Sequence, residues 1–283
     1  MAVSVPKLTF HIPVAASPAK IPTLLQVLSE TEEPVAKGPV LDELALERST
    51  ETTRFQESRV LAEEELGLIV TSNKALQLTP SATVLLKKRA AVQFDLLHFL
   101  FYTAWDKAQP TENVKSWPYR TICNYLWETQ SLKIDKEISK TLTQQIDNQA
   151  QEDFAEVPGF SSEKLSIGRQ SLAGLLVWLR SLQPAVMQDE EFCRRSTCSS
   201  ELFLLALSRS YELSDATVGM DLLLSPQRRN EICQLCLLDP LHFDRMLDWV
   251  IPIYPQFLAQ GTRSGSYGRF VRLNRLVGIE DLG

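Results

Sequence analysis

The feature that most constrains the fold is a pair of short apolar segments on either side of residue 73. Residues 67–71 (Gly-Leu-Ile-Val-Thr) and residues 75–79 (Ala-Leu-Gln-Leu-Thr) are strand-like, and Ser-Asn-Lys separates them. Two such segments joined by a short turn are typical of a β-hairpin. Pro80 and Ser81 follow at once, and proline suits the first turn of a helix. The sequence therefore predicts a hairpin that leads directly into a helix.

Helices are predicted on both sides of this hairpin. A helix over residues 17–30 has apolar residues at three- and four-residue steps, and a second, shorter helix is expected over residues 40–47. A third begins at Ser49 or Thr50, and ends near a buried Leu66 with Gly67 as the helix stop. After the hairpin, one helix is predicted from Ser81 to about Ala104, with Leu85 buried. Its second half is apolar on nearly all sides, so we expect it to be a buried strut that joins the hairpin to the rest of the chain.

Three helices, a hairpin and a Leu-Thr-Pro step into a further helix resemble the winged-helix superfamily. In that family Gly-Leu-Ile after the third helix begins the wing, and Leu-Thr-Pro closes it. The matching residues here are Gly67-Leu68-Ile69 and Leu78-Thr79-Pro80. The resemblance covers about residues 18 to 95 and implies a compact domain from about Ile21 to Leu97. An unrelated helical bundle with a single hairpin is the alternative.

Downstream of the hairpin the pattern is again mostly helical. Helices are predicted within residues 117–154 and 161–183, and residues 188–200 are polar enough to be a linker. Further helices are expected over residues 200–213 and 225–238, the second opened by Pro226, and from Asp239-Pro240 through Trp249. Residues 251–258 are expected to be extended, and residues 269–275 to form a strand after a Gly/Ser-rich turn.

These patterns predict a mainly α protein with three domains. Residues 1–109 form the winged helix with its long connecting helix, and residues 110–190 form a helical domain. Residues 191–283 form a C-terminal helical unit ending in a β-hairpin, for which a second winged helix is an alternative. The 283-residue length is enough for domains of this size.

Charge and targeting features limit the class of protein. The net charge is −6, so duplex binding over the whole surface is not expected, and any contact with nucleic acid must be local. The first residues lack the apolar core of a leader, and the most apolar run, 96–102, is too short to span a bilayer. We therefore expect a soluble, cytoplasmic protein with no membrane partner, and its five cysteines are expected to be reduced.

No motif for catalysis or cofactor binding stands out. Glycine-rich phosphate loops are missing, and the three histidines are far apart in the sequence, with His98 expected to be a core residue. The pairs Cys193/Cys198 and Cys233/Cys236 have the number of thiols that a zinc site needs, but the second pair lies in an amphipathic helix. The sequence therefore predicts a non-enzymatic protein without a cofactor or a bound metal.

Two basic segments are the candidate sites for nucleic acid. The first lies in a stretch, 249–279, that contains no acidic residue, and the second lies on and after the hairpin. Arginines in a flexible, glycine-rich loop can approach phosphate closely, and a tyrosine can stack on a base. Equally, the arginines can pair with the acidic residues of this same chain. The candidate residues are Arg263, Tyr267, Arg269, Arg272 and Arg275, together with Lys74, Lys87, Lys88 and Arg89.

Two functions compete on these observations. The resemblance implies a winged-helix subunit of a DNA-associated complex. By analogy with prokaryotic winged-helix proteins of similar size, such a subunit would belong to an antiviral defence or mobile-element system. However, the third helix carries five acids and two bases, which disfavours insertion into the major groove. The alternative is a scaffold whose winged helix docks a partner protein. Both hypotheses require other protein subunits as partners.

Overall fold

The computed structural model describes residues 10–14, 16–30, 35–36, 55–72, 75–157, 169–214, 216–261 and 269–283. The protein is mainly α, as predicted: of the residues in these ranges, 56% lie in helices and 12% in strands. The strands form small antiparallel sheets of three strands each. Across these ranges, every helix is too short or too polar to cross a lipid bilayer.

The first unit contains the predicted hairpin. It consists of α1 (Lys20–Glu30), β1 (Val35–Ala36), α3 (Gln56–Glu64), β2 (Ile69–Ser72) and β3 (Ala75–Leu78). Strand β3 lies between β1 and β2, and Ile69 is opposite Leu78. Gly67 has a φ of +59°, which a residue without a Cβ adopts at little cost, so it turns the chain from α3 into β2. Leu66 and Leu85 are buried, as expected.

The single helix predicted from Ser81 to Ala104 is wrong, because the structure breaks it into two. Helix α4 (Pro80–Leu86) is capped by the Thr79 hydroxyl, and α5 (Ala90–Thr103) begins after Arg89, whose backbone is extended. Helix α4 packs against α1 and the first sheet, whereas α5 packs against helices further along the chain. A straight helix cannot bury apolar residues in both places, so the chain bends at the exposed basic residues between them.

The second unit follows, with the same kinds of element. It consists of α6 (Ser116–Thr129), β4 (Ser131–Lys133), α7 (Lys136–Asp153), α8 (Arg169–Ser181), β5 (Met187–Gln188) and β6 (Glu191–Cys193). The prediction of a linker over residues 188–200 is wrong, since β6 pairs with both β4 and β5. Asp189 and Glu190 have positive φ angles and form the two-residue turn, so the expected boundary at residue 190 falls inside a hairpin.

The third unit ends the chain. It consists of α9 (Ser200–Glu212), β7 (Asp221–Leu223), α10 (Pro226–Cys236), α11 (Phe243–Ile253), β8 (Leu258–Gln260) and β9 (Phe270–Leu273). Pro226 occupies the first turn of α10, as predicted. The extended segment predicted over residues 251–258 is wrong, because α11 continues through Pro252 and β8 begins only at Leu258.

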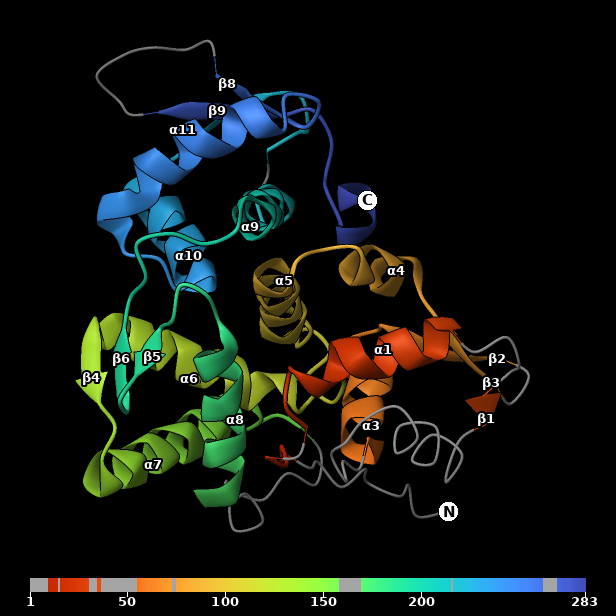
Figure 1. Ribbon diagram of the computed structural model, residues 1–283. Coiled ribbons are helices and arrows are strands. Elements are labelled where there is room, and N and C mark those ends of the chain that lie inside the picture. Colours follow the sequence, from red (N-terminus) through yellow and green to blue (C-terminus); the bar gives the residue numbers. More distant parts are fainter. Residues whose placement is uncertain are drawn as a thin grey trace.

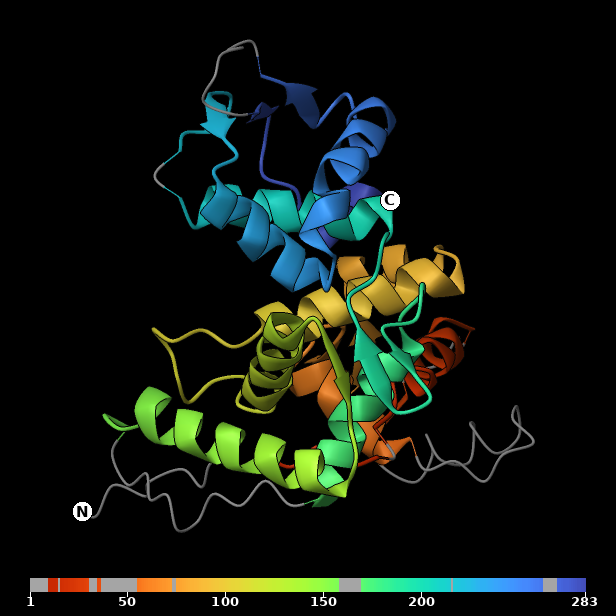
Figure 2. The ribbon, with the colours of Figure 1, turned by 90° about the vertical axis from the view of Figure 1, so that its left-hand side faces the viewer.

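The three sheets share one topology. Units two and three each have the order helix, strand, helix, helix, strand, strand; the described residues of the first unit give helix, strand, helix, strand, strand, and the helix predicted over residues 40–47 lies outside them. In every sheet the last strand lies between the other two, giving the orders β1-β3-β2, β4-β6-β5 and β7-β9-β8. Figure 1 shows the three units as separate lobes around α5, and Figure 2 shows the third unit stacked above the other two.

Two segments outside these lobes connect one unit to another. Residues 10–14 and Ala16 lie against the second unit, where Phe10 packs edge-on against Trp117 and the Ala16 carbonyl accepts a hydrogen bond from Trp178. The short helix η3 (Ile279–Leu282) returns to the first unit and packs against α4, with the Ser81 hydroxyl 3.4 Å from a carboxylate oxygen of Glu280. The first and last described segments therefore join units that are distant in sequence.

Candidate functional site

The arginines of β9 form ion pairs with acidic residues of the same unit. Arg269 contacts Asp244 at 3.3 Å and Asp248 at 2.5 Å, and its hydrogen bond to Asp248 lowers the pKa of that carboxyl. Arg272 lies 3.0 Å from Asp221 on the neighbouring strand β7. The local excess of positive charge in the sequence is therefore offset by acids from β7 and α11.

Arg275 is paired in the same way, at the end of the strand. Its guanidinium lies 2.8 Å from Asp281 and over the ring of Phe257, with 4.8 Å between the guanidinium carbon and the ring centre. The other candidates of this region, Arg263 and Tyr267, lie outside the described residues, as does Lys74 on the turn of the hairpin. Three of the predicted contact residues thus have partners within the chain.

The second basic segment lies at the break between α4 and α5. Lys88 is partly covered, and its amine is 3.5 Å from Glu201 at the start of α9. Lys87 and Arg89 are exposed, and neither forms an ion pair with any residue that the structure describes. Of the predicted basic residues in the described ranges, these two have the least compensated charge.

The third helices of the three units differ in what they expose. Helix α3 combines Glu57, Glu63 and Glu64 with one arginine, Arg59, which is itself paired with Glu63. Helix α8 is mostly buried, and the segment that includes His11 and Ala16 covers part of it. A Cβ at Gly174 of α8 would collide with the backbone carbonyl of Ile12. Neither helix offers a basic surface to a DNA groove.

Helix α11 has an exposed apolar face. Leu241, just before the helix, is 88% exposed, and Trp249 and Ile253 within it are 48% and 41% exposed. Trp249 and Ile253 are four residues apart, so they lie on one side of α11, and Leu241 is exposed in the 3-10 helix Pro240–His242 that precedes it. The carboxylates beside them, Asp244 and Asp248, are paired with arginines. An exposed apolar face flanked by compensated charges is typical of a surface that contacts protein.

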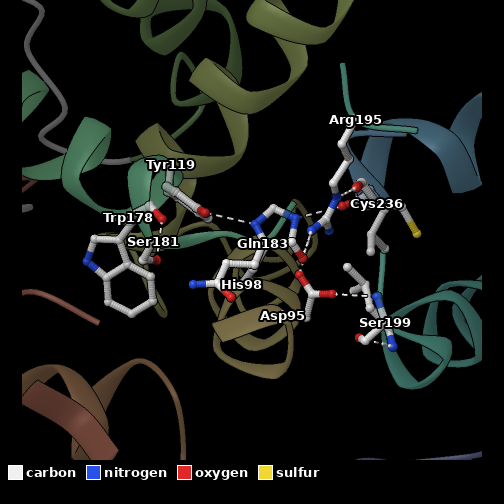
Figure 3. Close-up of polar contacts among 11 residues, drawn as sticks. Asp95, His98, Tyr119, Trp178, Ser181, Gln183, Arg195, Ser199 and Cys236 are labelled. Atoms are coloured by element: carbon white, nitrogen blue, oxygen red, sulfur yellow. Dashed lines mark hydrogen bonds and ion pairs between the residues drawn. The ribbon is translucent and has the colours of Figure 1, made fainter. Parts of the chain in front are cut away.

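A buried polar cluster lies where α5, α6, α9 and α10 meet (Figure 3). The Arg195 side chain is fully buried; it forms an ion pair with Asp95 of α5 at 2.7 Å and donates to the Cys236 carbonyl at 2.8 Å. The second carboxylate oxygen of Asp95 accepts from the backbone N–H of Ser199, which caps α9. We call Asp95, His98, Tyr119 and Arg195 the Arg195 cluster.

His98 supports the same cluster through both of its ring nitrogens. Nε2 is 2.7 Å from the Leu235 carbonyl and must donate to it, so the Tyr119 hydroxyl donates to Nδ1 at 2.8 Å. Burial disfavours the charged ring and lowers the pKa of His98 to about 4. The expectation of a core histidine is confirmed. Without access to solvent, this imidazole holds α5, α6 and α10 together and is not placed to transfer protons to a substrate.

The cysteines lie in two different environments. Cys198, Cys233 and Cys236 are buried, whereas Cys193 is exposed on β6. Burial raises the pKa of the Cys233 thiol to about 12, so it is protonated at neutral pH. Within the described ranges, no three His, Cys, Asp or Glu side chains are arranged to hold a metal ion.

Sequence patterns did not identify Asp95 and Arg195 as partners. Arg195 lies in the polar stretch that predicts a linker, where an arginine is normally exposed. The sequence does contain one signal: Asp95 is an acid in a helical segment that is otherwise largely apolar, which indicates a buried charge. A buried acid needs a partner, but the sequence does not say which base supplies it.

Comparison with known proteins gives this chain no relative: no family model, curated protein or solved structure matches it.

Proposed function

We propose that each of the three units is a winged helix, and that the chain is a non-enzymatic subunit which uses these units to dock partner proteins. The shared order of elements and the central position of the last strand support the first part. The antiparallel pair β2 and β3 supports it in the first unit, because the Gly-Leu-Ile step of the winged-helix pattern leads into β2 and the Leu-Thr-Pro step follows from the end of β3.

The apolar face of α11 carries the proposal of protein docking. In a winged helix that reads DNA, the third helix enters the major groove and presents polar or basic side chains to it. Here the helix at that position in the third unit exposes Trp249 and Ile253, and the 3-10 helix before it exposes Leu241. Because Asp244 and Asp248 are already neutralised by arginines, the face favours an uncharged, apolar partner surface.

Substitutions of the exposed apolar residues of α11, which leave its buried residues unchanged, test this function. The double variant Trp249→Ser, Ile253→Ser and the control Val70→Ser, which alters an exposed residue of β2, are each purified with partners cross-linked in native cells. We expect the double variant to lose partners that the parent and the control retain. Recovery of the same partners by the double variant would contradict the proposal.

Local contact with DNA is the second candidate function. Exposed Lys87 and Arg89 support it, as does the basic sequence that includes Arg263, Arg269 and Arg275. A labelled duplex titrated over a range of salt concentrations separates the two functions, because phosphate contacts weaken steeply with salt. A scaffold is expected to show no binding near physiological salt.

If the parent does bind DNA, a triple variant locates the contact. Replacing Arg263, Arg269 and Arg275 by Ala removes three cations, and the surface ion pairs of Arg269 and Arg275 contribute little to stability. For contact through this region, we expect DNA binding to be abolished and its salt slope to fall by up to about three. Undiminished binding by the triple variant would place the contact elsewhere, with Lys87 and Arg89 the next residues to change.

A further inference from the structure

A hollow lies between α6 and α7, apart from the surfaces and the buried cluster described above. Its volume is about 520 Å³, which lies in the range of small-molecule sites. Leu142 and Ile146 of α7 and Ile122 of α6 form part of its wall, and the loop after α5 closes one side. The hollow is much larger than a single inorganic ion, so a ligand that fills it must have an organic body.

Arg120 provides the positive charge of this hollow. Its guanidinium carbon lies 5.8 Å from the ring centre of Tyr102 and 6.0 Å from that of Trp105, and it makes a long contact of 3.5 Å with the Trp105 carbonyl. No carboxylate among the described residues forms an ion pair with it. The neighbouring Lys107, by contrast, is paired with Asp153. A guanidinium has five N–H donors; Arg120 uses the Trp105 carbonyl and the Tyr102 hydroxyl as acceptors, and no further acceptor for it is found among the described residues.

Other polar groups of the hollow have unused capacity. The Asn124 side-chain carbonyl accepts from the Tyr102 hydroxyl at 2.5 Å, and its amide nitrogen has no acceptor among the described residues. The Tyr125 hydroxyl and the Gln145 amide also lack a described partner. Asp153, the half-buried acid of the wall, already accepts from Lys107 and from the Trp117 indole, and the other acid of the lining, Glu128, is exposed to solvent at the rim. The inner polar groups that remain for a ligand are therefore the Arg120 guanidinium and the amide nitrogen of Asn124.

We propose that this hollow binds a small organic anion, with its phosphate or carboxylate group on Arg120 and Asn124. Guanidinium groups bind both kinds of anion through paired, charge-assisted hydrogen bonds. The body of the ligand lies along the half-exposed ring of Tyr125, from which it displaces water, whereas Ile122, Leu142 and Ile146 behind it are already buried. The site is independent of the proposed docking function, since it lies in the second unit, away from α11.

Titration calorimetry, together with the fluorescence of Trp105 and Trp117, tests the proposal. Phenyl phosphate and benzoate serve as probes, and benzyl alcohol is the neutral control with the same ring. We expect one molecule of an anionic probe to bind per chain, at least tenfold more tightly than benzyl alcohol. Binding of phenyl phosphate alone or of benzoate alone identifies the anionic group, and binding of both supports the shared chemistry.

Two variants at the site and one control distinguish anion binding from a general effect. Arg120→Gln and Asn124→Asp are each expected to weaken probe binding at least tenfold, the first by removing the cation and the second by adding a repelling charge. Arg245→Gln removes an exposed arginine of α11 and is expected to bind as the parent does. Thermal unfolding confirms that each variant is folded. Failure of the parent to bind either anion, or equal binding by a folded Arg120→Gln variant, would overturn the proposal.

Discussion

At the scale of single residues, the Arg195 cluster dominates the buried polar interactions of the chain. Taking two charges out of water is costly, and their mutual attraction offsets that cost only when hydrogen bonds satisfy the remaining polar atoms. Asp95 has a partner on each oxygen, whereas Nη2 of Arg195 has no hydrogen-bond partner among the described residues. The pair is therefore a weak source of net stability, but losing one partner would leave the other charge buried and alone.

Removal of Asp95 tests this asymmetry. We expect Asp95→Ala to lower the free energy of unfolding by about 3–5 kcal/mol, because it leaves Arg195 without its counterion. The double variant Asp95→Leu, Arg195→Met is expected to lose less than Asp95→Ala alone, since no charge then remains in the core. Urea denaturation of both variants measures the difference, and a double variant less stable than Asp95→Ala would contradict it.

His98 makes stability depend on pH. Its folded-state pKa of about 4 lies below the ordinary value of 6.5, so the unfolded chain binds a proton more readily. The contribution is fully present above about pH 6.5 and is lost as the pH falls towards 4, by about 3 kcal/mol in total. We expect His98→Gln to flatten this part of the pH profile. Urea denaturation at a series of pH values compares the two chains, and identical slopes would show that His98 does not contribute.

At the scale of elements, sequence patterns predicted the long helices better than the short strands. Helices such as α9 and α10 have periodic apolar residues and recognisable caps, Ser199 and Ser225, and both were predicted close to their observed bounds. Strands β4 and β7 have three residues each, and they pair with β6 and β9, far along the chain. So few residues show no alternation, and the partner that stabilises them is not adjacent in sequence.

The N-terminal segment that includes Ile12 packs closely against α8, and one added methyl group at Gly174 would disturb this contact. In a Gly174→Ala variant, the new Cβ meets the Ile12 backbone carbonyl, which cannot move away as a flexible side chain would. We expect a loss of about 1–3 kcal/mol from overpacking, with earlier proteolytic cleavage near residues 10–16. Thermal unfolding and limited proteolysis measure the two effects. Ala173→Ser, at the preceding and less buried position, is the matched control.

Leu66 tests the packing of the first unit. Its side chain is 3% exposed and lies where α3 gives way to the hairpin. We expect Leu66→Ala to cost about 2–4 kcal/mol, as is usual when a buried leucine leaves a cavity. Chemical denaturation measures the loss, and Val70→Ala, at an exposed position on β2, is expected to cost far less. Similar losses of unfolding free energy in both variants would show that the Leu66 side chain contributes no more to stability than an exposed side chain.

At the scale of the whole molecule, the sequence predicted a mainly α chain but not its threefold topology. The repeat is carried by element order and strand pairing, while the residues of the units differ: α3 is acidic, α8 is apolar and α11 has an exposed tryptophan. The amino-acid sequence therefore shows no strict repeat that would reveal the three units. The candidate basic residues were visible in the sequence, but their acidic partners were not, because Asp221 and Asp244 come close to β9 only through the fold.

The contact between η3 and α4 should transmit changes from the end of the described chain to its first unit. Ile279 and Leu282 are buried, although more than half of the chain separates them from α4. We expect Ile279→Ser with Leu282→Ser to speed amide hydrogen exchange in α4, and to leave exchange in α7 unchanged. Hydrogen-exchange mass spectrometry resolves the two helices. Equal acceleration in both would indicate global destabilisation, and no change in α4 would contradict the coupling.

The same contact sets an order of events during synthesis. Helix α4 leaves the ribosome early, but the residues that cover its outer side, 279–282, are made last among those described. Until then, the apolar surface that later meets Ile279 and Leu282 stays open to water or to another protein. The first unit therefore cannot reach its final packing while it is still a nascent domain. The packing around α4 is completed only after the third unit has been translated.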